Sequence, residues 1–320
     1  MRRRTVIAGI GLAALRFSAA RAAGKTYRLG VLASTPEAYP TEMFEGLRAL
    51  GYVEGQNLVV ERRFSQGVNE RWPALAQELV ALKVDAIVCG TTPAALAAKR
   101  ATSTIPIVIP TAIDPVGAGL AESLARPGGN VTGGAIQSPE MSAKVLSLLK
   151  QMVPGLSRVA VLWNAGNPAF APVWQVLDTA AASLDLTLVK APVREPDDFP
   201  SAFAAIAAQR PEGFLLLLDE FVLKRMPAIV EFASNHRLAS ASTVRLFAAA
   251  GGLMSYGPSM SWPMQLAAHY LDRIFRGANP ATLPFQQPTE FELVINLKTA
   301  KALGLAVPQS LLARADEVIE

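Results

Sequence analysis

The feature that most constrains the fold of this 320-residue sequence is an alternation of strands and helices that runs through the chain twice. In the first run, short apolar segments predict strands at residues 27–33, 58–62, 85–89 and 105–110. Amphipathic segments between them predict helices at residues 43–50, 72–82 and 94–101. Strands joined by helices form a parallel sheet that helices cover on both faces.

The second run repeats the first at an offset of about 130 residues, so that RVAVL at 158–162 echoes RLGVL at 28–32. It predicts strands at 158–162, 186–191, 213–218 and 238–240, and helices at 141–152, 167–184, 198–209 and 226–236. The sequence therefore predicts an α/β protein of two similar lobes with parallel sheets. Between the runs we expect a short helix at 114–125 and a Gly-rich loop or hinge at 126–134.

The remaining segments are too few for a third domain, and we expect them to complete the two lobes. They predict strands at 252–255 and 292–295, helices at 262–275 and 298–303, and an extended segment at 284–288. The first lobe would comprise residues 23–135 and 258–288, and the second 136–257 and 289–320. The chain then crosses between the lobes more than once.

Residues 1–22 are typical of a secretory signal peptide. Arginines 2–4 precede an apolar core at 6–15, and the A-x-A motif at 20–22 places cleavage after Ala22. Without this leader the chain has 25 basic and 26 acidic side chains, so its basic character predicts no nucleic-acid partner. Cys89 is the only cysteine, which excludes an intrachain disulfide and a lipid anchor at the leader's end. We expect an exported, periplasmic protein, with the Sec and twin-arginine routes both open.

The junction after the third predicted strand is a candidate anion site. Gly90 ends the strand, Thr91 and Thr92 follow, and Pro93 opens an Ala-rich helix. Two hydroxyls and the free backbone N–H groups of a helix start suit a small carboxylate. Taken alone, these residues are explained more simply by ordinary helix capping, but the chain supplies several more strand ends of this kind.

Six segments resemble the ABC-transporter substrate-binding proteins of the tryptophan/tyrosine-type family, over essentially the whole mature chain. They are GLRALGYVEGQNLVVERR (46–63), VDAIVCGTTPAALAAKRATSTIPIV (84–108), DPVGAGLAESLARPGGNVTG (114–133), VPGLSRVAVLWN (153–164), GGLMSYGPS (251–259) and QPTEFELVINLKTAKALGL (287–305). The resemblance implies a type I periplasmic-binding-protein fold, whose two lobes close on a small solute and deliver it to a permease driven by a separate ATPase. Residues 238–250 depart from the family pattern, which has an aromatic-containing run there, so the resemblance does not assign the ligand.

Ligands of parallel α/β sheets bind beyond the carboxyl ends of the strands, here in the cleft between two facing lobes. The candidate ligand-binding residues are Ser34, Thr35, Thr91, Thr92, Thr111, Asp114, Trp163, Asn164, Asp219 and Tyr256. We expect the Thr91–Thr92 pair to hold a carboxylate and Asp219 or Asp114 to hold an ammonium group. Trp163 would stack on an apolar side chain of the ligand or enclose it.

These residues also have structural alternatives. Asp114 could cap the next helix, Trp163 could pack between the lobes, Tyr256 could belong to the hinge, and Asp219 with Glu220 could form a solvated helix start.

An enzyme is not indicated. His236 and His269 both fall inside predicted helices, and the sequence has no nucleophile elbow, phosphate-binding loop or metal-spaced set of Cys and His. We therefore predict no catalytic residues, metal or cofactor, and a monomer whose partners are a small ligand and a permease with its ATPase. A ligand-presenting sensor protein remains the alternative function, with an enzyme on the same fold behind it.

Overall fold

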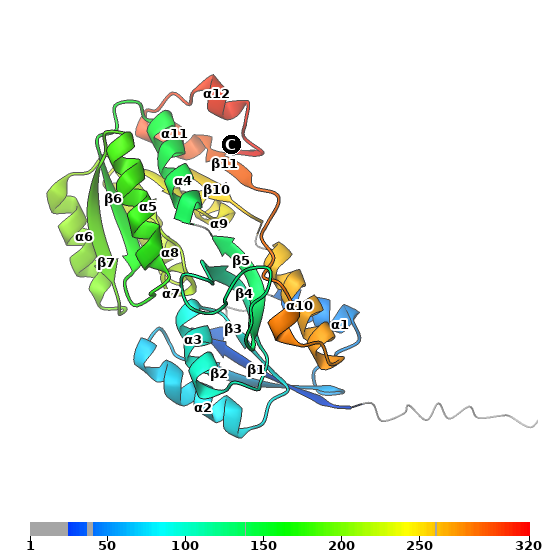
Figure 1. Cartoon of the computed structure of the whole chain (residues 1–320). Coiled ribbons are helices and arrows are strands. Elements are labelled where there is room, and N and C mark those ends of the chain that lie inside the picture. Colours follow the sequence, from blue (N-terminus) through cyan, green and yellow to red (C-terminus); the bar gives the residue numbers. More distant parts are fainter. Residues whose placement is uncertain (1–24, 37–40, 138, 260) are drawn as a thin grey trace, which may run out of the picture.

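The computed structural model describes residues 25–36, 41–137, 139–259 and 261–320, and it consists of two α/β lobes (Figure 1). The predicted signal peptide lies outside the described residues. Among the described residues, no helix combines the length and the apolar character needed to cross a membrane.

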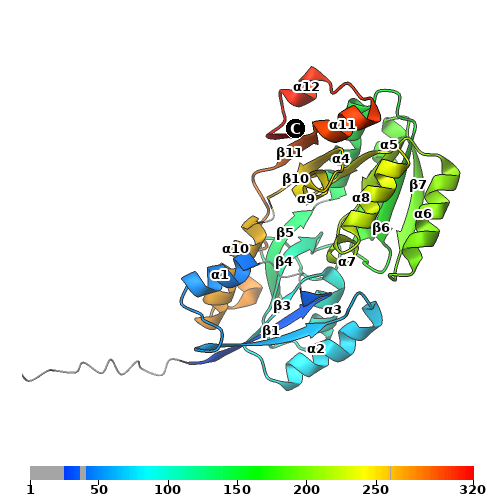
Figure 2. The same cartoon turned by 180° about the vertical axis from the view of Figure 1, so that it is seen from behind.

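The first lobe is built on a five-stranded parallel sheet with the order β2-β1-β3-β4-β5. Its strands are β1 (Tyr27–Ala33), β2 (Leu58–Phe64), β3 (Ala86–Cys89), β4 (Ile107–Ile113) and β5 (Val131–Gln137). One face is covered by α1 (Thr41–Ala49) and α10 (Ser261–Phe275), which lie side by side in Figures 1 and 2. The other face is covered by α2 (Trp72–Ala81) and α3 (Thr92–Ala101). The short helices η2 (Asn69–Arg71) and η3 (Pro280–Thr282) flank α2 and β5.

The second lobe is built on a seven-stranded sheet with the order β12-β11-β10-β9-β8-β6-β7. Its strands are β6 (Arg158–Asn164), β7 (Thr187–Val193), β8 (Gly213–Leu216), β9 (Ala239–Ser242), β10 (Met254–Gly257), β11 (Glu292–Asn296) and β12 (Glu317–Ile319). All neighbours are parallel except β10 and β11.

Helices also cover both faces of the second sheet. α4 (Pro139–Met152) and α5 (Phe170–Ser183) pack on one face, and α6 (Asp198–Gln209) and α8 (Met226–Asn235) on the other. The shorter helices are α7 (Glu220–Leu223), α9 (Arg245–Ala249), α11 (Leu297–Leu303) and α12 (Gln309–Leu312).

The two sheets share one topology, which confirms the predicted pair of similar α/β lobes. The order β2-β1-β3-β4-β5 recurs as β7-β6-β8-β9-β10, and β11 and β12 extend the second sheet. The central strands are apolar and buried on both faces, as in AIVC of β3 and GFLL of β8. Full burial of one such aliphatic side chain contributes roughly 1.5–3 kcal/mol, so each sheet is stabilised by its two helical layers.

Two expectations for residues 114–134 are wrong. Residues 114–125 form a series of turns in place of a helix, and Asp114 adopts a left-handed conformation with φ of 37°. The Gly-rich segment expected to be a loop or hinge contains the start of β5. Gly133 runs so close to the backbone carbonyl of Ile109 that any side chain would collide with it. The glycines at this point therefore serve close strand packing, which a sequence pattern does not distinguish from a loop.

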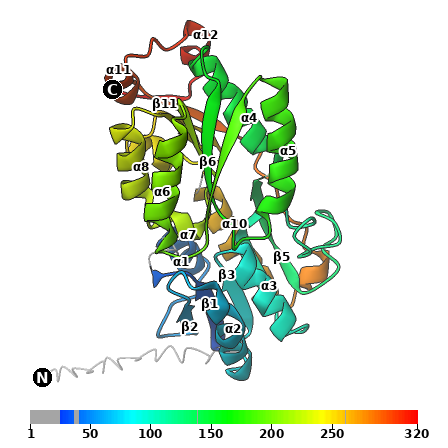
Figure 3. The same cartoon turned by 90° about the vertical axis from the view of Figure 1, so that its left-hand side faces the viewer.

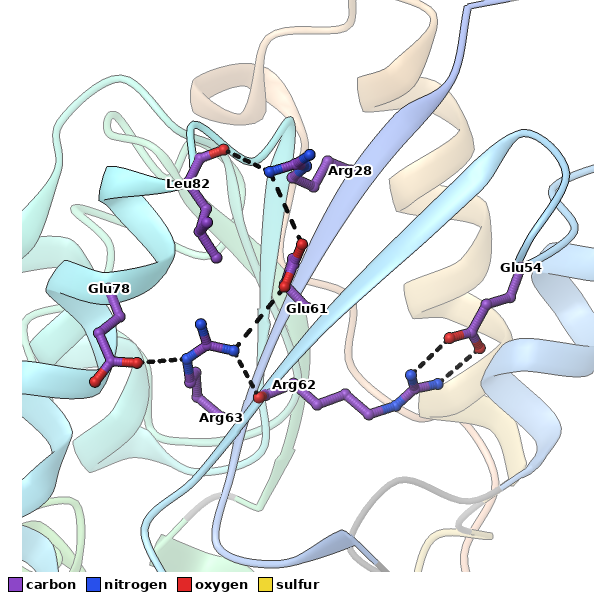
Figure 4. A network of polar contacts seen from close by, with 7 residues as sticks. All are labelled: Arg28, Glu54, Glu61, Arg62, Arg63, Glu78 and Leu82. Carbon is purple, nitrogen blue, oxygen red and sulfur yellow. Dashed lines mark hydrogen bonds and ion pairs between the residues drawn. The ribbon is translucent and has the colours of Figure 1, made fainter.

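The exposed edge of the first sheet carries a network of ion pairs along β2 (Figure 4). Arg62 binds both carboxylate oxygens of Glu54 at 2.6 and 2.8 Å, and Arg63 donates to Glu78 at 2.5 Å. Exposed pairs of this kind typically contribute less than about 1 kcal/mol each. Charges along an edge strand also discourage pairing with a second sheet edge.

Candidate functional site

In both sheets the carboxyl ends of the mutually parallel strands β1–β5 and β6–β10 face the junction of the lobes, and α7 lies there at the edge of the second lobe next to the first (Figures 1 and 3). The lobes touch through the segments that follow their strands. The backbone N–H of Ser34, after β1, donates to Glu220 Oε1 at 2.6 Å, and Gly67, after β2, packs against the Phe221 ring. Gly166, after β6, lies against the side-chain amide of Asn69. These contacts bring strand ends that are far apart in sequence to one place.

The end of β1 supplies two buried hydroxyl residues, Ser34 and Thr35, each 2% exposed. They follow β1 because Ala33 is its last residue and the chain turns away from the sheet there. Their position beside Glu220 places backbone and hydroxyl donors against a carboxyl group of the other lobe.

The end of β3 forms the predicted strand-to-helix junction. Thr91 is the N-cap of α3, and its Oγ1 accepts a hydrogen bond from the Ala94 N–H at 3.2 Å. The capping alternative therefore describes Thr91 correctly. Thr92 is only 1% exposed, and its hydroxyl has no hydrogen-bond partner among the described residues. An unpaired buried hydroxyl is costly, so Thr92 is the member of the pair whose hydroxyl still lacks a hydrogen bond.

The end of β4 contains Thr111 and Asp114. The Thr111 hydroxyl donates to the Gly90 carbonyl oxygen at 3.4 Å, which ties β4 to the β3 end. Asp114 Oδ1 accepts from the Gly117 N–H at 3.0 Å and closes a turn. Asp114 thus has a local structural role, although no helix follows it.

In the second lobe Asp219 is the N-cap of α7 and the centre of a hydrogen-bond network. Its Oδ1 accepts from the N–H groups of Phe221 and Val222 at 3.0 and 3.2 Å. Its Oδ2 accepts from the side-chain amides of Asn164 and Asn167 at 2.9 and 3.1 Å. Burial raises the pKa of Asp219 above its ordinary value, and these four donors, which favour the charged form, offset part of that rise.

Glu220 follows Asp219 and projects its carboxyl group into the first lobe. Its Oε2 is buried and has no hydrogen-bond partner among the described residues. It lies in the space that Gly90 leaves empty because glycine has no side chain. Burial raises the pKa of Glu220 to about 8, and the nearby Asp219 charge acts in the same direction. The Ser34 and Thr35 donors favour the ionised form and oppose this rise. Asp219 and Glu220 do start a helix, as one of the alternatives predicted. Their carboxyl oxygens, however, are hydrogen-bonded within the protein or buried, and they are not solvated.

The two aromatic candidates pack within the second lobe. The Trp163 ring lies 4.5 Å from that of Trp174 at an interplanar angle of 66°, and the Tyr256 ring is stacked 5.9 Å from that of Phe291. Both Trp163 and Tyr256 are half-buried, so each keeps an exposed part.

An open cavity of about 280 Å³ adjoins Glu220 between the lobes. It is lined by Ser34, Thr35, Gln66, Gly67, Pro196, Phe199, Glu220, Phe221, Lys224 and Arg225. Among the described residues, no group of three or more His, Cys, Asp or Glu side chains is placed to hold a metal ion. Cys89 is a buried core thiol whose pKa burial raises, so it is a packing residue.

Comparison with known proteins identifies the family. Residues 37–319 match the family described as ABC transporter substrate binding protein. The chain belongs to this family.

Two solved structures and one further relative are similar to this ABC transporter substrate-binding protein. A tyrosine-binding protein of Clostridioides difficile (strain R20291) is 25% identical over 262 residues, which cover 82% of this chain and 75% of that protein. A conserved domain protein from Vibrio cholerae O1 biovar El Tor strain N16961 is 30% identical with a TM-score of 0.85, covering 92% of this chain and all of the other. A Streptococcus pneumoniae ABC domain in complex with L-Trp has a TM-score of 0.83 at 24% identity, over 92% of this chain and all of the other. The predicted type I periplasmic-binding-protein fold is confirmed.

The sequence placed the candidate site of this substrate-binding protein at the strand ends, with Asp219–Glu220 among them, but Glu220 was assigned no ligand contact of its own. Asn167 and Gly90 were given no role in ligand binding. A buried strand that runs directly into two acidic residues is the signal that could have drawn attention to Glu220. The ligand contacts of all ten candidate residues stay predictions.

Proposed function

We propose that the protein is the exported receptor of an ABC importer, which captures a small zwitterion or carboxylate between its lobes and delivers it to a membrane permease with its ATPase. The observation that carries this proposal is the set of buried polar groups where the two lobes meet. Ser34, Thr92 and Glu220 come from three strand ends of two sheets, and Thr92 and Glu220 each keep an unpaired buried oxygen. Such groups are costly in a protein unless a ligand completes their hydrogen bonds.

An amino acid is the ligand class that these groups favour. The α3 N-terminus and the Thr92 hydroxyl offer donors to a carboxylate, whereas the second lobe presents carboxyl groups to a cation. The tyrosine-binding relative and the tryptophan-bound structure support the same class. Half-buried Trp163 and Tyr256 would then contact the side chain of the ligand.

Capture would proceed by lobe closure, with the segments that link the sheets as hinges. One bilobed chain encloses its ligand unaided, so we propose a monomer with boundaries at residues 23–135 with 258–288 and 136–257 with 289–320. The basic and apolar leader supports export to the periplasm.

Ligand binding is tested by isothermal titration and thermal shift of the protein from Ala23 onward. L-tyrosine and L-tryptophan are the probes, and D-allose and myo-inositol are the controls. A ligand at 100 times its dissociation constant should stabilise the folded protein by about 2.7 kcal/mol. Binding of an amino acid supports the proposal. Binding of D-allose or myo-inositol alone would be consistent with a receptor but would refute the ligand class. Turnover of a probe would refute the receptor role.

A further inference from the structure

The carboxyl group of Glu220 bridges the lobes with only one of its two oxygens paired. Oε1 accepts the Ser34 N–H at 2.6 Å, while Oε2 is buried and has no partner among the described residues. Gly90 faces Oε2, and even an alanine methyl there would collide with it. The glycine thus leaves space for a carboxyl group that reaches across from the other lobe.

No cation balances this carboxyl group within the described part of the chain. Lys224 and Arg225 line the adjoining cavity, yet neither forms an ion pair with Glu220 within 4.0 Å. The other titratable groups that act on it are Asp219 on its own segment and Cys89 on β3. The surface carboxylates along β2 differ, because Glu54, Glu61 and Glu78 each have an arginine (Figure 4).

The neighbouring Asp219 is not free to supply the missing interaction. Both of its oxygens already accept two hydrogen bonds each, from Asn164, Asn167 and the α7 backbone. A carboxylate can accept about four hydrogen bonds, so Asp219 is saturated. Of the two adjacent acids, only Glu220 has an unpaired buried oxygen.

We propose that Glu220 is the charge-selecting residue of the cleft: its unpaired oxygen receives the protonated amine of the ligand, and closure around a ligand without an amine must take up a proton instead. This inference rests on the proposed function, because it concerns the ligand that the cleft encloses. It assigns the ammonium contact to Glu220, whereas the sequence suggested Asp219 or Asp114.

The proton linkage follows from the burial of the group. In an open, solvated cleft Glu220 has an ordinary pKa near 4.3, whereas burial between the lobes raises the pKa to about 8. At pH values between these two pKa values, closure around a ligand without a cation takes up one proton. The affinity for such a ligand therefore falls about tenfold for each unit by which the pH increases. An ammonium group removes this dependence, because the carboxylate then stays ionised on closure.

The test compares L-tyrosine with 3-(4-hydroxyphenyl)propionate, which lacks only the amine, by isothermal titration at pH 5.5 and 7.0. In the wild type the ratio of their affinities should rise in favour of tyrosine by up to about 30-fold between these pH values, as one coupled proton requires. Glu220→Gln keeps the shape and the Oε1 acceptor but does not titrate. It should weaken tyrosine binding at least about tenfold, spare the propionate and make the ratio independent of pH. Asp197→Asn changes an exposed acid that lines a second pocket together with Pro196 and Phe199; it is the matched control and should resemble the wild type.

A second measurement needs no variant. Titration of the wild type at pH 7.0 in two buffers of different protonation enthalpy should show uptake of nearly one proton with the propionate and almost none with tyrosine. An unchanged affinity ratio in Glu220→Gln, or equal proton uptake for both probes, overturns the inference while the receptor function stands. Failure of both probes to bind the folded wild type overturns the proposed amino-acid function and the inference with it.

Discussion

The ends of β3 and β8 occupy equivalent places in the two sheets, yet they carry opposite chemistry. After β3, Thr91 caps the ten-residue helix α3, and the junction presents a hydroxyl and backbone N–H groups. After β8, Asp219 caps the four-residue helix α7, and the junction presents carboxyl groups. In each case the first residue is used by its own helix, and the next one, Thr92 or Glu220, keeps an unpaired buried oxygen.

A repeated topology here places polar groups of opposite character at the junction of the lobes. Both lobes direct strand ends at the same place because their sheets share one strand order. The cap residue stabilises the local structure, and the residue after it keeps an unpaired buried oxygen. Donors on one lobe and carboxyl groups on the other are complementary to a ligand that carries both charges.

The largest effect is expected from removing the second-lobe cap. Asp219→Ala leaves the amides of Asn164 and Asn167 and two backbone N–H groups without an acceptor. It should lower the free energy of unfolding by about 3 kcal/mol, because buried donors are left unpaired. Urea denaturation followed by circular dichroism measures the change. Asp178→Ala, which breaks an exposed ion pair with Lys190, serves as control and should cost less than about 1 kcal/mol.

The second-largest effect is a pH dependence of the free energy of unfolding, which arises from the titration of Glu220. With the lobes in contact its pKa is raised to about 8, so the closed folded state, populated here with saturating 3-(4-hydroxyphenyl)propionate, holds a proton that the unfolded chain releases near its ordinary pKa of about 4.3. The stabilising contribution is complete below about pH 4 and declines as pH rises, until it is lost above about pH 8. Wild type should therefore lose up to about 2 kcal/mol relative to Glu220→Gln between pH 6 and 7.5. Parallel stability curves for the two proteins would contradict the buried, unpaired carboxyl group.

A smaller loss is expected at the first-lobe cap. Thr91→Ala removes the side-chain acceptor of the Ala94 N–H at the start of α3. The free energy of unfolding should fall by about 1 kcal/mol, the usual value for an N-cap. Thr91→Ser retains the hydroxyl and should recover most of that loss. A loss of free energy of unfolding as large as that of Asp219→Ala would show that the two caps contribute equally to stability.

The smallest effect is expected at Thr92, where a change should separate stability from binding. Thr92→Val replaces an unpaired buried hydroxyl by a methyl group of the same shape. The ligand-free protein should be unchanged or more stable by up to about 1 kcal/mol, because no hydrogen bond is lost and a polar group is no longer buried. Calorimetric melting gives the stability, and titration with L-tyrosine should show weaker binding. A destabilised ligand-free protein would mean that the Thr92 hydroxyl is already paired.

Much of the fold could be read from the sequence because it depends on local patterns. The strand at Tyr27–Ala33 and the helix at Asp198–Gln209 were predicted with the bounds that the structure has. The prediction for the segment around β5 was wrong. Its glycines let the backbone of β5 come close to that of β4, and no local sequence signal reveals this contact. Thr91 as a cap was among the alternatives, since capping is also local.

The two α/β lobes, and the strand ends as the expected place of the site, could be derived from the sequence alone. Periodicity, capping residues and the repeat carry that information within short segments. Which of the two adjacent acids keeps an unpaired oxygen depends on contacts that form in the folded chain. Asp219 is saturated by Asn164 and Asn167, and Glu220 is bound by Ser34, a residue 186 positions away. Burial and pairing depend on which distant segments meet, so they set the chemistry of Glu220 only when the lobes come together.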